Sequence, residues 1–276
     1  YKDRAKRVLT EEERLLGRTK ICPERDVPRR PIYPLVYTCG GEPYVFTATL
    51  VDPRSQSKVA TITSPDEIDI VQKMGCYGYV PGQEQLRSAA ANVTGTDLKA
   101  SLLYLFDTEI FFLLHGLGCL QVRIPRSFLQ NEDGSETKSA TRQLWNMLCS
   151  RSGDADQRSH GLPDFPSRYA AYFYYRSNGW IVRPSLALGG VDFLLYAEPP
   201  QLRHAAYAVL VVPASSTGRT VRDITAHFRV VSSVAKKLII ARVSAPSDRD
   251  LSGEPWEAIK NYAIEETLIS REVDFC

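Results

Sequence analysis

Three side chains that could perform acid–base chemistry lie in the second half of the chain: Tyr196, His204 and Lys236. Tyr196 ends one short apolar run and His204 precedes another, so both are expected at the ends of strands. Functional groups are often carried at the loop ends of a rigid scaffold. A histidine transfers protons near neutral pH, a tyrosine can orient or deprotonate a hydroxyl if its pKa is lowered, and a lysine stabilises negative charge.

Such a set suits the cleavage of RNA, whose ribose 2′-OH is its own nucleophile. The reaction needs one group to take the 2′ proton, one to protonate the 5′-oxygen and a cation near the phosphate oxygens. The residue types alone are weak evidence, because every protein contains them. Tyr196 could simply expose its hydroxyl, His204 could cap a strand, and Lys236 and Arg229 could be solvated cations.

The composition excludes several other classes. The 276 residues carry 34 Lys and Arg against 32 Asp and Glu, a net charge of +2 that does not by itself indicate nucleic-acid binding. The six cysteines include no C-x-x-C pair, which disfavours a zinc site. A disulfide framework is also disfavoured in a chain of this length, so we expect reduced thiols in an intracellular protein.

The sequence lacks the common motifs of cofactor and metal sites. It contains no Walker loop, no G-x-G-x-x-G after a strand, no G-x-S-x-G, no H-E-x-x-H and no acidic cluster. We therefore expect neither a cofactor nor a metal. No apolar run approaches membrane-spanning length, and no signal peptide is evident. Because the chain begins at Tyr1 rather than Met, a fragment of a longer protein is one interpretation.

Composition shifts along the chain predict three segments. Residues 1–40 form a charged, proline-rich arm that is either solvated or docks on a partner or RNA. A polar stretch over 150–166, rich in Gly and Pro, is the best candidate boundary. We expect an α+β N-terminal domain over 41–160 and a C-terminal domain over 161–276.

The N-terminal domain shows a hairpin pattern over 44–51 and 58–62. Ser64 is the expected N-cap of the next helix, with Glu67 completing a capping box and Gly75 ending it. Asp107 or Thr108 is the expected N-cap of a second helix, which is apolar nearly all round and therefore buried. A strand over 119–124 and a short helix over 143–148 follow.

The C-terminal domain alternates strands with helices, which predicts an α/β fold with a central mixed sheet. The expected helices cover 166–178 and 220–231, and the expected strands cover 180–183, 191–196, 207–212, 238–243 and 262–270. In the later helix, Val221, Ile224, Phe228 and Val231 are predicted to face inward, and Arg222 and Arg229 outward. The aromatic run over 172–175 could stack bases, but its helical spacing favours a core role.

The order and context of these residues resemble a known family. The segments are YFYYRSNGWIVR at 172–183, GGVDFLLY at 189–196, HAAY at 204–207 and AKKL at 235–238. Together they resemble the catalytic domain of the tRNA-splicing endonuclease, and within it the eukaryotic subunit that cuts the 5′ splice site. The similarity is densest over 166–245 and extends more weakly to GCYG at 75–78 and to 107–120.

The resemblance implies a role for each residue. Tyr196 would act as general base or orient the 2′-OH, His204 would be the general acid, and Lys236 would stabilise the transition state. Arg229 would hold a base of the RNA by cation–π contact. Lys237 competes for the lysine role, but the alignment favours Lys236. The products would be a 2′,3′-cyclic phosphate and a 5′-hydroxyl, formed without metal.

The resemblance also implies partners. The chain would be one of two catalytic subunits, assembled with two structural subunits into a heterotetramer that cuts intron-containing pre-tRNA. The expected location is the nucleus, or else the mitochondrial outer surface. Two alternatives remain at this point: a non-catalytic scaffolding subunit of the same complex, and a metal-dependent DNA nuclease on a similar sheet.

Overall fold

The computed structural model describes residues 37–39, 41–52, 58–81, 102–125, 136–150, 164–185, 190–200, 202–216, 220–246 and 253–269. The predicted arm lies outside these residues except at 37–39, and so does most of the expected boundary over 150–166. The division into an arm and two domains therefore stays a prediction.

The first half of the chain builds a four-stranded sheet in the order β5-β4-β3-β6. Its strands are β3 (Phe46–Leu50), β4 (Val59–Ile62), β5 (Leu103–Phe106) and β6 (Leu120–Arg123). β3 and β4 are antiparallel, which confirms the predicted hairpin, and β6 returns parallel to β3. A separate two-stranded ribbon joins β1 (Thr38–Cys39) and β2 (Glu42–Pro43).

Helix α2 (Pro65–Gly75) follows β4, with Ser64 as its N-cap as predicted. Only one half of the predicted capping box forms: the Ser64 hydroxyl accepts the Glu67 N–H at 3.5 Å, but the Glu67 carboxylate accepts a 2.7 Å hydrogen bond from the Tyr44 hydroxyl and does not return to the N-cap. The residue that ends the helix in the left-handed region is Cys76, at φ 56°, and not Gly75. Gly75 is the last helical residue, and a Cβ there would lie 2.4 Å from the Tyr77 ring.

The second predicted helix is confirmed as a buried element. It consists of α4 (Asp107–Phe111) and a π turn, η3 (Phe112–Gly116). Its N-cap is Phe106 and not Asp107 or Thr108. The carboxylate of Glu109 accepts the Phe106 N–H at 3.1 Å and the Gly78 N–H at 2.9 Å, so it joins α4 to the chain after α2.

The second half builds a five-stranded mixed sheet in the order β11-β10-β9-β8-β7. Its strands are β7 (Ile181–Pro184), β8 (Phe193–Tyr196), β9 (Tyr207–Pro213), β10 (Lys237–Ser244) and β11 (Ala263–Ile269). Only β9 and β10 pair in parallel, and the other pairs are antiparallel. The predicted α/β class and the central mixed sheet are confirmed.

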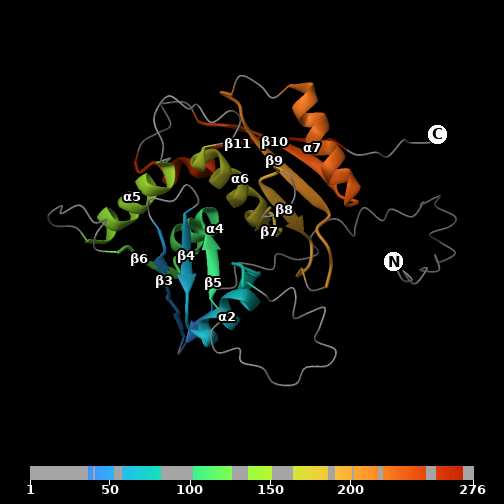
Figure 1. The fold of residues 1–276 in the computed structure, drawn as a ribbon. Helices are drawn as coiled ribbons and strands as arrows, with labels where there is room; N and C mark the ends of the chain where they lie inside the picture. Colours follow the sequence, from blue (N-terminus) through green and yellow to red (C-terminus); the bar gives the residue numbers. More distant parts are fainter. Residues whose placement is uncertain are drawn as a thin grey trace, which may run out of the picture.

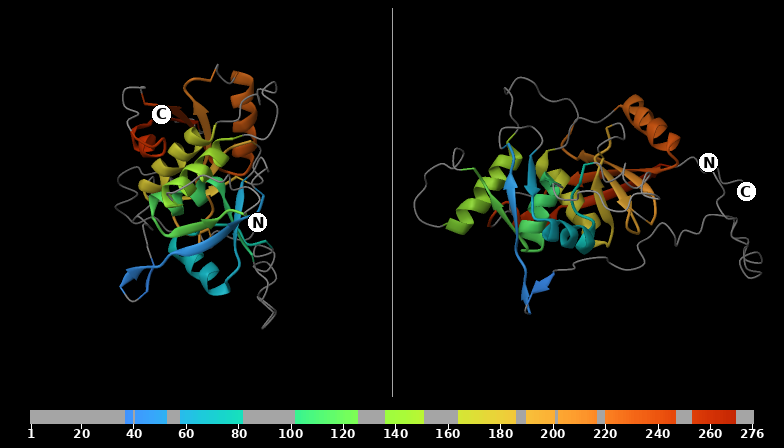
Figure 2. Two further views of the ribbon diagram at one scale, coloured as in Figure 1. Left: turned by 90° about the vertical axis from the view of Figure 1, so that its left-hand side faces the viewer. Right: turned by 60° about the horizontal axis from the view of Figure 1, so that its bottom comes forward.

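Helices cover both faces of this sheet (Figures 1 and 2). Helix α6 (Phe165–Ser177) packs on the inner face, where one large hydrophobic cluster joins it to the four-stranded sheet and to α5 (Glu136–Cys149). Helix α7 (Val221–Ser233) packs on the outer face over a smaller cluster that contains Ala208, Leu210, Val231 and Leu238. The aromatic residues Tyr172 and Tyr175 are buried in the large cluster, as their spacing predicted.

The prediction for α7 is wrong at one position. Val221, expected to face inward, is 81% exposed, whereas Val231 is buried and Arg222 and Arg229 are exposed. The short 3-10 helix Glu257–Asn261 precedes β11. Among the described helices, none is long and apolar enough to cross a membrane.

Candidate active site

The topology brings the three predicted catalytic residues to one end of the five-stranded sheet. Leu195, the last residue but one of β8, pairs with Tyr207 at the start of β9, which in turn pairs with Lys237 at the start of β10. Tyr196 directly follows Leu195 in the chain, and Lys236 directly precedes Lys237. Two strand spacings separate them, so their Cα atoms lie about 10 Å apart.

Backbone hydrogen bonds hold this end of the sheet together. The Ala206 N–H donates to the Leu195 carbonyl at 3.0 Å, and the Lys237 N–H donates to the Ala206 carbonyl at 3.2 Å. One peptide segment, two residues after His204, therefore ties β8 to β10. The strand ends that carry the candidate residues are held by the sheet itself.

Tyr196 is placed on the outer face of the sheet, the face that α7 covers. Phe193 and Leu195 belong to the large inner cluster, whereas Leu194 packs against the smaller cluster under α7. Side chains alternate between faces along a strand, so Tyr196 shares the face of Leu194. Its side chain is half-buried.

His204 follows a tight turn that leads from β8 back to β9. The Pro199 carbonyl accepts hydrogen bonds from the Leu202 N–H at 2.8 Å and the Arg203 N–H at 3.1 Å. The two hydrogen bonds that this carbonyl accepts restrain the chain directly before the histidine. His204 is exposed, so its imidazole is accessible to a substrate.

Lys236 lies where the chain leaves α7 and enters β10. Its N–H donates to the Val231 carbonyl at 3.2 Å, and its ammonium lies 3.4 Å from the Val234 carbonyl. The preceding residue, Ala235, has φ 54°, a left-handed conformation that costs a non-glycine residue about 1 kcal/mol. This backbone strain lies directly before the candidate lysine. It could not be predicted from the sequence, because alanine is not a residue typical of the left-handed conformation.

Partial burial lowers the pKa of Lys236 below the ordinary lysine value. The cationic form is therefore lost at a lower pH than for an exposed lysine. We predict that the ratio of the Lys236→Arg cleavage rate to the wild-type rate increases with pH, because arginine keeps its charge while lysine loses it. Single-turnover rates from neutral to alkaline pH, corrected for uncatalysed hydrolysis, measure this ratio. A ratio independent of pH would show that the charge of Lys236 is not needed.

The remaining two candidates lie close by in the chain. Arg229 is exposed on α7, one turn before the helix ends. Lys237 is already part of β10, where it pairs with Tyr207 and is half-buried. By strand alternation Lys237 is placed on the opposite face from Leu238, which packs under α7. Lys236 is therefore better placed than Lys237 to share a face with Tyr196.

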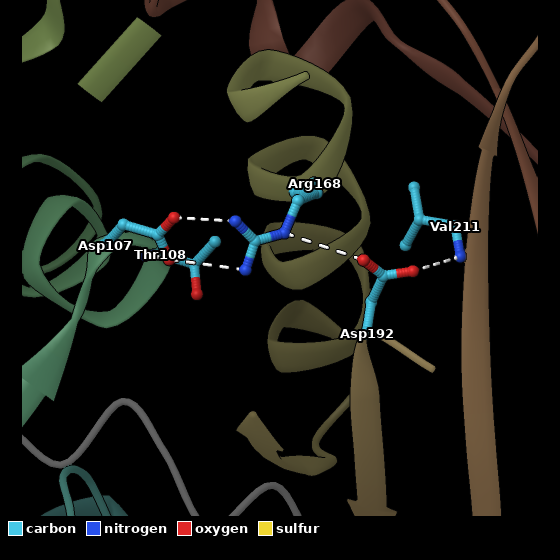
Figure 3. Close-up of polar contacts among 5 residues, drawn as sticks. All are labelled: Asp107, Thr108, Arg168, Asp192 and Val211. Atoms are coloured by element: carbon cyan, nitrogen blue, oxygen red, sulfur yellow. Dashed lines mark hydrogen bonds and ion pairs between the residues drawn. The ribbon is translucent and has the colours of Figure 1, made fainter. Parts of the chain in front are cut away.

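An ion-pair network positions β8 from its other end (Figure 3). The Arg168 guanidinium on α6 donates to the Asp107 carboxylate at 2.7 Å and lies 3.6 Å from Asp192. The second oxygen of Asp192 accepts the Val211 N–H at 2.8 Å. These contacts link α4, α6 and β9 to the residue that precedes β8. Arg168 gave no signal in the sequence, because its partners come from distant segments.

No set of three His, Cys, Asp or Glu side chains within the described ranges is arranged to hold a metal. The candidate groups carried at this end of the sheet are a phenol, an imidazole and an amine. They can exchange protons with a substrate and stabilise an anion. Tyr196 ends β8, and His204 and Lys236 lie in the segments that lead directly into β9 and β10.

Comparison with known proteins defines the class of this domain. Residues 165–251 match the family model of the tRNA intron endonuclease, catalytic C-terminal domain. This segment contains all four predicted site residues and the three central strands β8, β9 and β10. Residues 165–251 are therefore a domain of the tRNA intron endonuclease class.

Relatives that match more of the chain identify its family. The tRNA-splicing endonuclease subunit Sen2-1 of Arabidopsis thaliana is 31% identical over 181 residues, which cover 65% of this chain and 68% of that protein. The probable subunit Sen2 of Oryza sativa subsp. japonica is 32% identical over 170 residues, and Sen2 of Mus musculus is 29% identical over 173. The chain belongs to the tRNA-splicing endonuclease family, and these relatives are all Sen2 subunits.

The relatives differ in how much of their length is matched. The matched part covers 59% of this chain and 50% of the rice protein, and 60% of this chain and 33% of the mouse protein. The chain thus spans half or less of these two relatives.

Proposed function

We propose that this chain is the catalytic subunit of a tRNA-splicing endonuclease that cleaves intron-containing pre-tRNA at the 5′ splice site. The supporting observation is the convergence of Tyr196, His204 and Lys236 at one end of β8, β9 and β10, in a segment that matches the endonuclease catalytic domain. Residues 161–276 would form the catalytic domain.

In the proposed reaction Tyr196, as a phenolate, takes the proton of the ribose 2′-OH, or as a phenol orients the hydroxyl while water takes the proton. The 2′-oxygen attacks the adjacent phosphorus. The bond from phosphorus to the 5′-oxygen breaks as His204 gives that oxygen a proton. The Lys236 ammonium offsets the added negative charge on the non-bridging oxygens. The products are a 2′,3′-cyclic phosphate and a 5′-hydroxyl, and no metal or other cofactor takes part.

The chain would act within an assembly. Its net charge of +2 is small for a protein that must hold a polyanion, so the assembled complex would supply most of the tRNA footprint. A second catalytic subunit and two structural subunits would complete a heterotetramer. Its location, in the nucleus or at the mitochondrial surface, stays a prediction.

Analysis of the product ends tests this function. The full-length protein, reconstituted with its partner subunits, is incubated with an intron-containing pre-tRNA in excess EDTA. We expect cleavage at the 5′ splice site, a cyclic phosphate on the 5′ exon and a 5′-hydroxyl on the intron. A 3′-hydroxyl with a 5′-phosphate, or cleavage that stops in EDTA and returns with Mg²⁺, would contradict the proposal. It would favour a metal-dependent nuclease.

A further inference from the structure

Helix α7 presents one side to the sheet and the opposite side to solvent. Its docked side carries Ile224, His227, Phe228 and Val231, which are buried or half-buried. A helix advances 100° per residue, so the side facing away from Val231 is the stripe through 222, 226, 229 and 233. All four residues of this stripe are exposed, and Figure 1 shows α7 on the outer face of the five-stranded sheet.

The outward stripe combines two cations with two small residues. Arg222 and Arg229 are seven residues apart, so they lie on one side of the helix with their Cα atoms about 10 Å apart. Ala226 lies between them and Ser233 follows, so no bulky side chain separates the guanidinium groups. A strand of nucleic acid can therefore approach the helix surface between the two arginines.

The charge on this stripe is not neutralised within the described part of the chain. Neither Arg222 nor Arg229 takes part in an ion pair there. The one carboxylate on α7, Asp223, instead accepts hydrogen bonds from the Thr220 N–H at 3.0 Å and the Thr220 hydroxyl at 2.8 Å. That carboxylate caps the helix, which leaves the arginines available to an external anion.

The stripe runs along α7, and the C-terminal end of this helix lies next to the candidate active site. The C-terminal end of α7 is bonded to Lys236, whose N–H donates to the Val231 carbonyl. Moving away from Lys236 along the helix, Arg229 comes first and Arg222 follows two turns later. The three cations at 222, 229 and 236 are evenly spaced in the sequence and lead away from the strand ends.

We propose that Arg222 binds a backbone phosphate of the RNA beyond the nucleotide held at Arg229, so that the outer side of α7 is a track for the RNA strand leading away from the cleavage site. This inference rests on the proposed function and extends it. Arginine suits the role, because its planar guanidinium binds phosphate in a bidentate manner. A phosphate contact positions the substrate and does not read its bases.

The test measures substrate affinity and its salt dependence in the reconstituted complex, with the full-length protein and an intron-containing pre-tRNA. We expect Arg222→Ala to raise KM about fivefold and to leave kcat unchanged. The logarithm of the RNA-binding constant falls with the logarithm of the salt concentration, and the magnitude of this slope should decrease by about 1, because one phosphate contact is lost. Arg222→Lys should keep most of the slope, because it retains the charge.

Lys73→Ala is the matched control. Lys73 is exposed on α2, the helix that follows β4 of the four-stranded sheet. Its replacement by alanine removes one positive charge, as Arg222→Ala does. We expect this control to leave KM and the salt slope at the wild-type values. An equal effect of both variants would overturn the proposal, because it would reflect net charge alone.

The exposed valines beside the stripe suggest a different occupant, a protein partner, as another outcome. Loss of complex assembly in Arg222→Ala, seen by size-exclusion chromatography, would show a protein interface and overturn the RNA track. A wild-type KM and salt slope in a variant that still cleaves would overturn the track and leave the proposed function intact. If the wild-type complex does not cleave, the proposed function itself has failed.

Discussion

Replacing His204 with alanine is expected to reduce the rate of 5′-site cleavage by about 10²- to 10⁴-fold, the usual contribution of a positioned general acid. The 5′-oxygen of ribose is a poor leaving group unless it receives a proton as the bond to phosphorus breaks. The substrate should still bind, because an exposed imidazole contributes little to holding a polyanion. The effect should therefore appear in kcat and leave KM nearly unchanged, as single-turnover kinetics on the reconstituted complex would show.

His115→Ala provides a matched control for the loss of an imidazole. His115 lies in the π turn after α4, exposed, with its ring centroid 5.6 Å from that of Phe111, and far along the chain from the sheet end. We expect its variant to cleave at the wild-type rate. Unchanged 5′-site cleavage by His204→Ala would contradict the catalytic role and favour a scaffolding subunit.

The sheet end that carries the candidate site could be predicted because its signals are local. The strand that contains Tyr196 and the strand that follows His204 are short apolar runs bounded by turn residues, and the structure places both within a residue or two of the expected bounds. The helix before Lys236 has a clear N-cap at Thr220, which also completes a capping box with Asp223. Adjacent strands then bring the three segments together.

Contacts between distant segments could not be predicted from the sequence. Glu67 stands where a capping box needs it, but Tyr44 is 23 residues away and offers its carboxylate a better partner. Val221 fits the inward pattern of α7, yet the pattern gives only the side of a helix and not how far the helix extends beyond the sheet. Its exposure follows from the position of α7 on the sheet.

Arg176 shows the same limit at the centre of the molecule. In the sequence it only continues the helical spacing of α6, but in the structure it is a fully buried cation. Its guanidinium donates to the Tyr172 hydroxyl at 3.0 Å and to the carbonyls of Gly75 at 2.9 Å and Val182 at 3.4 Å. It also lies 4.2 Å from the centroid of the Tyr77 ring.

These contacts join α2, α6 and β7 through one side chain. Val182 in β7 pairs with Leu195, the residue before Tyr196 in β8. Through β7, the arginine therefore connects α2 to the strand that carries the candidate base. Glu109 is also buried, and this burial raises the pKa of its carboxyl. The groups that oppose the increase are, in decreasing order, the Arg183 charge, the N–H groups of Gly78 and Phe106, and the Arg176 charge. Loss of the Arg176 charge would therefore favour the protonated form of Glu109.

We expect Arg176→Met to lower the free energy of unfolding by about 3–5 kcal/mol, the usual cost of removing one partner from a buried charged network. Methionine fills much of the volume but leaves two buried carbonyls and a phenol without their donor. Urea unfolding of the full chain measures the change. Arg142→Met is the control, because Arg142 pairs with Glu254 at the surface and should cost about 1 kcal/mol or less. Equal losses in the two variants would show that the buried contacts of Arg176 add nothing to stability.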